Sequence, residues 1–203
     1  MTVVLLDPRW PTLIPLEAYS RVAHPISYSG EVPVAVRWNF GDLISAQCPR
    51  GIGTVLSTDA NDAEVQRRQA AGEEVIEAPS RRDPVWQAQQ TMQRARDIGE
   101  WEMSQTHATL LPYLEEEAGE FAQAVRLGAD DAALCQELGD VLLQVLFHAE
   151  IASRRGAFDF AAVAQSFVDK MRARAPYLFD GSTAVVPTEV QESLWQAAKA
   201  GQR

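Results

Sequence analysis

Two pairs of carboxylates at helical spacing are the residues with the clearest capacity for chemistry. Glu117 and Glu120 are three positions apart, and so are Glu137 and Asp140. Side chains at this spacing lie on one face of an α-helix. One such pair is most often a solvated surface, but two pairs on consecutive predicted helices could converge. Four converging carboxylates would supply the oxygen ligands that Mg²⁺ and Mn²⁺ prefer.

The surroundings of the two pairs favour a metal site over a solvated surface. On a helical wheel, Glu117 and Glu120 lie at the edge of the apolar face of their segment. The segment that carries Glu137 and Asp140 is apolar on nearly every side, which predicts a helix buried inside a bundle. Buried carboxylates without a counter-charge are costly or take up protons. Because the first segment supplies more acids rather than cations to pair with them, we expect the four acids to bind divalent cations.

The elements that must position these residues are predicted to be helices. Helical periodicity dominates after a linker-like segment at 79–84, and capping residues mark the helix ends. The predicted helices cover 84–98, 109–127, 130 or 131 to 155, 159–174 and 188–200. We therefore predict an all-α helical bundle at 84–203.

The first 80 residues show a different pattern. Short β-rich runs predict strands at 3–6, 33–38, 54–58 and 74–79, with a helix between the last two. A strand, a helix and a strand in this order predict a small parallel α/β domain at 1–80. Since it contains neither a glycine-rich dinucleotide motif nor a phosphate-binding loop, its role is left open.

Composition excludes several classes of protein. The net charge of −10 and the pI near 4.8 argue against a nucleic-acid-binding surface, which needs a basic stripe. The chain has no run of apolar residues long enough to cross a membrane, and its N-terminus lacks the basic region of a signal peptide. Cys48 and Cys135 stand far apart, without metal-binding spacing, which favours free, buried thiols. We expect a cytoplasmic protein.

Two classes of enzyme hold divalent cations with acidic helices. Ferritin-like di-iron bundles need a glutamate three residues before a histidine. In this chain, the residue at that position is serine before His107 and valine before His148. This mismatch disfavours iron, and His148 is expected to be a hydrogen-bonded core residue. Phosphoryl chemistry instead uses metals to neutralise phosphate oxygens and to activate water. Lys170 and Arg174, four positions apart on a later predicted helix, could together face those phosphates.

Several segments between about 99 and 200 carry a resemblance to a known family: QTHATLLPYLEEEAGEFAQAV, ELGDVLLQVLFHAEIA, FDFAAVAQSFVDKMRARAPYLF and SLWQAAKA. They resemble the MazG family of all-α nucleoside triphosphate pyrophosphohydrolases. The N-terminal part resembles the short α/β region that precedes the MazG domain in actinobacterial MazG proteins. The resemblance implies a dimeric MazG-type helical bundle that hydrolyses an NTP or dNTP to the monophosphate and pyrophosphate, using Mg²⁺.

Matching motifs imply roles for individual residues. The two acidic pairs would be the metal ligands, Lys170 and Arg174 would contact phosphate, and Trp195 and Lys199 would contact the nucleotide. The chain departs from the family in GEWEMSQTH, which lacks the CPWD-type turn and the basic residue common there. Because Trp101 and His107 remain in this stretch, we expect the loop to border the nucleotide.

The predicted reaction is metal-assisted hydrolysis of an NTP or dNTP, with Mn²⁺ as a substitute for Mg²⁺. Glu116 stands next to the first acidic pair and is a candidate to orient or deprotonate the attacking water. The sequence does not distinguish undamaged nucleotides from oxidised ones, which a house-cleaning enzyme would remove. The alternative is a non-catalytic helical interaction or regulatory module that has kept the bundle. Four acids without cations argue against that alternative.

Overall fold

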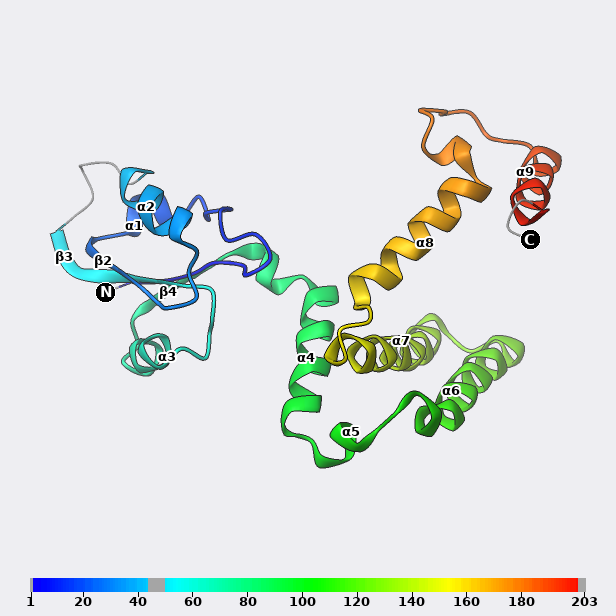
Figure 1. Ribbon diagram of the computed structural model, residues 1–203, viewed down its shortest axis with the longest axis horizontal. Helices are drawn as coiled ribbons and strands as arrows, with labels where there is room; N and C mark the ends of the chain where they lie inside the picture. The colour runs from blue at the N-terminus through cyan, green and yellow to red at the C-terminus, as the bar shows by residue number, and fades with distance from the viewer. Residues whose placement is uncertain (1, 44–49, 201–203) are drawn as a thin grey trace. The chain divides into compact units, whose positions relative to one another are not determined.

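The computed structural model describes residues 2–43 and 50–200. It divides into two compact units, Met1–Gln87 and Ala88–Arg203 (Figure 1). The division falls after the first turn of helix α4, Pro84–Ile98, rather than in the predicted linker at 79–84. Residues of that turn belong with the first unit because the Arg9 guanidinium lies 4.9 Å from the centre of the Trp86 ring.

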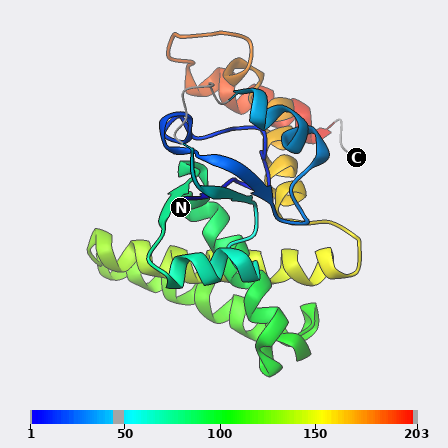
Figure 2. The same cartoon turned by 90° about the vertical axis from the view of Figure 1, so that its left-hand side faces the viewer.

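The first unit is a parallel sheet with helices on both faces. Its described strands are β1 (Thr2–Leu5), β2 (His24–Tyr28), β3 (Arg50–Ser57) and β4 (Glu74–Glu77), in the order β2-β3-β1-β4. Helices α1 (Ala18–Arg21) and α2 (Val34–Leu43) cover one face and α3 (Ala63–Ala70) the other (Figure 1, Figure 2). The predicted α/β fold is therefore confirmed.

One predicted strand of this unit is wrong, and one strand was missed. Residues 33–38 lie almost entirely in α2, because Val32, Val36 and Phe40 are buried at a spacing of four residues, which is a helical period. The alternating apolar residues of PVAVRW concealed that period. Strand β2, with the sequence HPISY, gave no strand signal since it contains a proline and is largely exposed.

The second unit is helical. It contains α4, α5 (Glu100–Ser104), α6 (His107–Leu127), α7 (Asp131–Arg154), α8 (Phe160–Arg174) and α9 (Thr188–Ala200). Short 3₁₀ turns cover Pro79–Arg82 in the first unit and Pro176–Leu178 in this one. Helices α6 and α7 lie side by side as a hairpin (Figure 1). Met92, Leu110, Leu146, Phe147 and Ile151 form the core between α4, α6 and α7.

Helix ends are set mainly by side-chain caps. Asp130 and Asp159 accept hydrogen bonds from backbone N–H groups at the starts of α7 and α8, and Gly128 ends α6 in the left-handed region at φ 69°. Helix α6 begins two residues earlier than predicted. The Thr106 side chain caps the helix by accepting a hydrogen bond from the Thr109 backbone N–H. In return, the Thr109 side chain accepts a hydrogen bond from the Thr106 backbone N–H. Pro112 therefore lies inside the helix instead of in its first turn.

The prediction that α7 is buried on all sides is wrong for the single chain. Leu138, Leu142 and Leu143 are 51%, 39% and 43% exposed, because α6 and α4 cover only one side of the helix. Cys135, on the same helix, is exposed rather than buried, and Cys48 lies outside the described residues. Among the described helices, none has the length and apolar character needed to span a membrane.

Candidate metal centre

The hairpin of α6 and α7 brings three of the four predicted ligands together. Glu117 and Glu120 come from α6 and Glu137 comes from α7, and one carboxylate oxygen of each lies within 4.8 Å of the others. Asp140, one turn after Glu137, is close enough for its charge to raise the pKa of Glu117. Side chains from two antiparallel helices thus form one acidic cluster.

In the described parts of the chain, this cluster has no paired lysine or arginine. Among the described residues, no ion pair joins these four carboxylates to lysine or arginine. Burial raises the pKa of Glu117, and the charges of Asp140, Glu120, Glu116 and Glu137 raise it further. The Glu137 Oε2 atom is buried and has no hydrogen-bond partner among the described residues. A buried carboxylate oxygen without a donor suits a hard divalent cation, so the donor set fits Mg²⁺ or Mn²⁺.

Glu116 and Glu115 precede the first ligand on α6, and both are exposed. The negative charge of Glu116 contributes to the raised pKa of Glu117. Glu116 therefore lies at the edge of the cluster, in reach of solvent.

The predicted nucleotide-side residues Trp101 and His107 take part in contacts of their own. His107 is stacked on His148 with the rings 5° from parallel, and their Nδ1 atoms are 2.7 Å apart. Arg155 donates to the His107 Nε2 atom at 2.9 Å. Trp101, half exposed, packs edge to face on Tyr113 and Phe147.

The histidine pair confirms that His148 is hydrogen-bonded and adds a partner that the sequence analysis missed. The order of the residues along the two predicted helices could have identified this partner. If Glu117 faces Glu137 across antiparallel helices, His107, ten residues earlier, should face a residue near 147. That register places the histidines about 15 Å along the helices from the acids.

The predicted phosphate-side and nucleotide-side residues of α8 and α9 meet each other. The Arg174 guanidinium lies 4.8 Å from the centre of the Trp195 ring. Lys170 is one turn before Arg174 on α8, and Lys199 is one turn after Trp195 on α9; both lysines are exposed. The two helices thus carry a basic and aromatic cluster, and neither lysine pairs with the acids described above.

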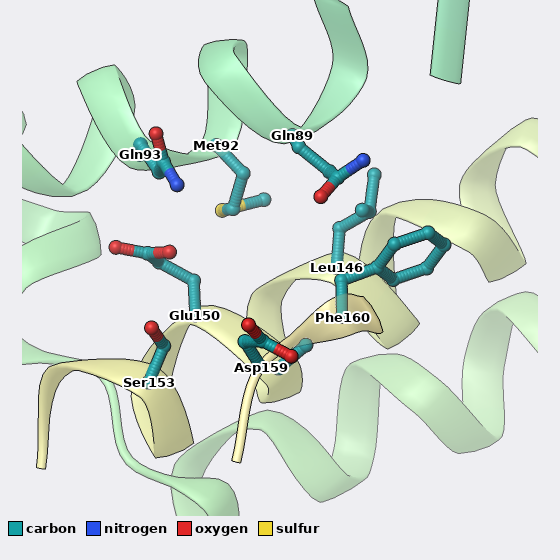
Figure 3. A pocket seen from close by; sticks show the side chains of 9 residues that line it. Gln89, Met92, Gln93, Leu146, Glu150, Ser153, Asp159 and Phe160 are labelled. Carbon is teal, nitrogen blue, oxygen red and sulfur yellow. The ribbon is translucent and has the colours of Figure 1, made fainter. Parts of the chain in front are cut away.

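A polar cavity of about 100 Å³ lies between α4, α7 and the start of α8 (Figure 3). Two acids line it, but both are engaged. Glu150 pairs with Arg154 at 2.7 Å, and Asp159 accepts from the Ala162 backbone N–H at 2.8 Å. These contacts explain both acids structurally, in contrast to Glu117, Glu120 and Glu137.

Comparisons with known proteins agree with this division of the chain. A family model described as the MazG N-terminal domain matches residues 1–76, and one described as the MazG nucleotide pyrophosphohydrolase domain matches residues 105–179. The chain is 41% identical over 207 residues to a nucleoside triphosphate pyrophosphohydrolase of Mycobacterium tuberculosis (strain ATCC 25618 / H37Rv), covering all of this chain and 63% of the relative.

Two further proteins are similar over part of the chain. The nucleoside triphosphate pyrophosphohydrolase of Escherichia coli (strain K12) is 40% identical over 116 residues, or 55% of this chain and 43% of the relative. A crystal structure of a mazG-related protein from Thermotoga maritima is 30% identical, with a TM-score of 0.49, over 56% of this chain and 97% of that chain. The chain spans less than two thirds of the length of these curated relatives. Since MazG models match part of each unit, and the mycobacterial similarity runs through the whole chain, the chain belongs to the MazG family.

Proposed function

We propose that this chain hydrolyses nucleoside triphosphates, NTPs or dNTPs, to the monophosphate and pyrophosphate in a Mg²⁺-dependent reaction. One observation carries the proposal: Glu117, Glu120 and Glu137 converge within 4.8 Å, with Asp140 beside them and no cation paired to them among the described residues. The printed name of the mycobacterial relative, nucleoside triphosphate pyrophosphohydrolase, supports the same reaction.

Each proposed role follows from a side chain's chemistry. The four acids would hold the divalent ions, with Mn²⁺ as a substitute, and bound metal would neutralise the phosphates and lower the pKa of water. Glu116 would accept the proton of the attacking water, whose oxygen bonds to the α-phosphorus as the bond to the pyrophosphate oxygen breaks.

The basic and aromatic cluster would bind the rest of the substrate. Lys170 and Arg174 would contact phosphate oxygens, and Trp195 and Lys199 the nucleoside. Trp101 offers an exposed ring for stacking on the base. His107 would hold the loop in place, because both of its ring nitrogens already have partners.

We also propose that the working form is a homodimer. An apolar groove of about 390 Å³ lies between α4, α5 and α7, and its lining includes Trp101, Gly139, Leu142 and Leu143. A side chain built on Gly139 would meet no atom within 4 Å, so another helix can approach closely there. A second copy would bury the leucines of α7 that one chain leaves exposed. Leu142→Glu should give monomers by analytical ultracentrifugation, whereas Leu16→Glu, an exposed leucine of the other unit, should not.

The decisive experiment for the reaction is a substrate panel. The protein is incubated with Mg²⁺ and each common NTP and dNTP, and with oxidised pyrimidine and purine dNTPs, while pyrophosphate is assayed. A preference for oxidised nucleotides would assign a house-cleaning role. Release of orthophosphate would move the attack to another phosphorus, and no release from any nucleotide would contradict the proposed reaction. Location in the cytoplasm remains a prediction.

A further inference from the structure

Gln144 is a buried amide of α7 with an acceptor that has no partner among the described residues. It lies on α7, one helical turn after Asp140, and only 4% of it is exposed. Its Oε1 atom is buried and has no hydrogen-bond partner among the described residues. The only other orphaned buried carboxylate or amide oxygen of the described part of α7 is Glu137 Oε2, a proposed metal ligand on the same polar stripe.

An unsatisfied amide oxygen in this position is costly for folding. A buried acceptor without a donor destabilises a protein, whereas an apolar side chain of similar shape carries no such penalty. The neighbours of Gln144 on α7 at helical spacing do not provide the donor. Asp140 is an acceptor when ionised. The Nδ1 atom of His148 is bonded to His107, and its Nε2 atom is itself buried without a hydrogen-bond partner among the described residues, so it does not donate to Gln144.

A bound group close to Asp140 would supply the missing donor. Gln144 stands about 6 Å along the helix axis from Asp140, which is one turn. Mg²⁺ and Mn²⁺ bound by carboxylates keep several water ligands, and such waters are strong donors. We propose that Gln144 is a positioning residue whose amide oxygen accepts a hydrogen bond from a water ligand of the divalent ion. This inference rests on the proposed metal-dependent function, because it needs an ion among the four acids.

The test measures metal binding without nucleotide. Isothermal titration with Mn²⁺ is carried out on the full chain and on Gln144→Met, Gln144→Glu and Gln136→Met. Methionine matches glutamine in length but cannot accept the bond, whereas glutamate keeps an acceptor oxygen. Gln136 is an exposed glutamine of the same helix and provides the matched control. Thermal melting without metal reports the folding of each variant.

We expect Gln144→Met to weaken Mn²⁺ binding about 10-fold or more, as loss of an outer-shell contact typically does. Its melting temperature without metal should be equal to or above that of the wild type, because an unsatisfied polar atom has been removed. Gln144→Glu should bind Mn²⁺ at least as tightly as the wild type, and Gln136→Met should be unchanged.

Several outcomes would overturn the inference, and they are distinguishable. Unchanged Mn²⁺ affinity in Gln144→Met would overturn it. If the KM for nucleotide rises while the Mn²⁺ affinity stays unchanged, Gln144 contacts the substrate instead of a metal-bound water. A lower melting temperature with unchanged affinity would mean a purely structural role. If the wild type itself fails to bind Mn²⁺, this result contradicts both the proposed metal centre and the proposed role of Gln144.

Discussion

The two units of this chain surround their carboxylates in opposite ways. In the α/β unit, Asp7 is fully buried, and its burial acts to raise its pKa, but hydrogen bonds from Arg9 and Ser80 outweigh this and lower the pKa to about 2. In the helical unit, burial raises the pKa of Glu117, and the charges of neighbouring acids raise it further. The α/β unit supplies donors to Asp7, whereas the helical unit brings Glu117, Glu120 and Glu137 together without a paired lysine or arginine among the described residues.

This contrast supports the helical unit as the site of the proposed reaction. Ligands of parallel α/β sheets bind at the carboxyl ends of the strands. Here the protein's own donors occupy that edge. Arg9 pairs with Asp7 at 2.7 Å, and Arg81 donates to the carbonyl oxygens of Leu6 and Thr58, both at 2.9 Å. Glu31 likewise accepts from Ser57 Oγ at 2.7 Å and from the Thr58 backbone N–H at 3.0 Å. Acids with such partners are structural, whereas Glu117, Glu120, Glu137 and Asp140 have no paired lysine or arginine among the described residues, as the proposed metal centre requires.

The largest effect should come from removing one unmatched acid. Glu137→Gln keeps the shape of the side chain but removes a metal-ligand charge, so we expect the rate of pyrophosphate release to fall about 100-fold or more. Without metal, its melting temperature should stay equal or rise, because repulsion among the acids decreases. Glu115→Gln, at an exposed position of α6, should keep the wild-type rate. Wild-type activity in Glu137→Gln would place the metal centre elsewhere.

Removing a matched donor should affect stability rather than catalysis. Arg9→Met leaves the buried Asp7 carboxylate without its partner, so the free energy of unfolding of the α/β unit should fall by about 2 kcal/mol. Urea denaturation followed by circular dichroism measures this loss. Arg21→Met breaks an exposed pair with Glu74 and should have little effect, since surface ion pairs contribute little. Equal losses in both variants would remove the distinction between matched and exposed acids.

Sequence reasoning located the acidic cluster because it needed only helical periodicity and two helix ends. Helix α7 was predicted within one residue at each end, since Gly128 and Asp130 mark the turn before it. The spacing of Glu117, Glu120 and Glu137 then fixed the faces on which they lie. The contact between Arg174 and Trp195 also joins residues that the family resemblance had grouped by role.

Features that depend on how two helices align, or on which elements cover a helix, could not be predicted in the same way. The stacking of His107 on His148 requires knowing how far α6 slides along α7. The exposure of Leu138 and Leu142 depends on what covers α7, which an apolar pattern alone does not identify. Helix α2 was mistaken for a strand because six residues of PVAVRW fit both periods, and only Phe40, beyond that run, extends the helical one.

Metal should stabilise the wild type more than a variant of its centre. With free Mg²⁺ at about ten times its Kd, binding should add about 1.4 kcal/mol to the free energy of unfolding of the helical unit, which raises its melting temperature by a few degrees. A chelator should reverse the rise. Glu137→Gln should show a much smaller rise, and Arg9→Met the full one. If a chelator does not change the melting curve of the wild type, the acids do not bind a stabilising divalent cation, which would contradict the proposed metal centre.

The smallest effect should appear in the acid dependence of the two units. Burial lowers the pKa of His148 below 6.5, and the neighbouring His107 lowers it further. The unfolded chain therefore binds a proton at His148 more readily than the folded chain does, so this histidine's contribution to stability is full above pH 6.5 and is lost as pH falls toward the lowered pKa. In the α/β unit, the pKa values of Glu31 and Asp7 are lowered from 4.5 and 3.8 to about 2, so their contributions are lost only below those starting values. Melting curves between about pH 7.5 and about pH 5 should thus show a loss in the wild-type helical unit that His148→Gln lacks, with the α/β unit unchanged. An identical pH dependence in wild type and His148→Gln would mean that the histidine pair carries no linkage to folding.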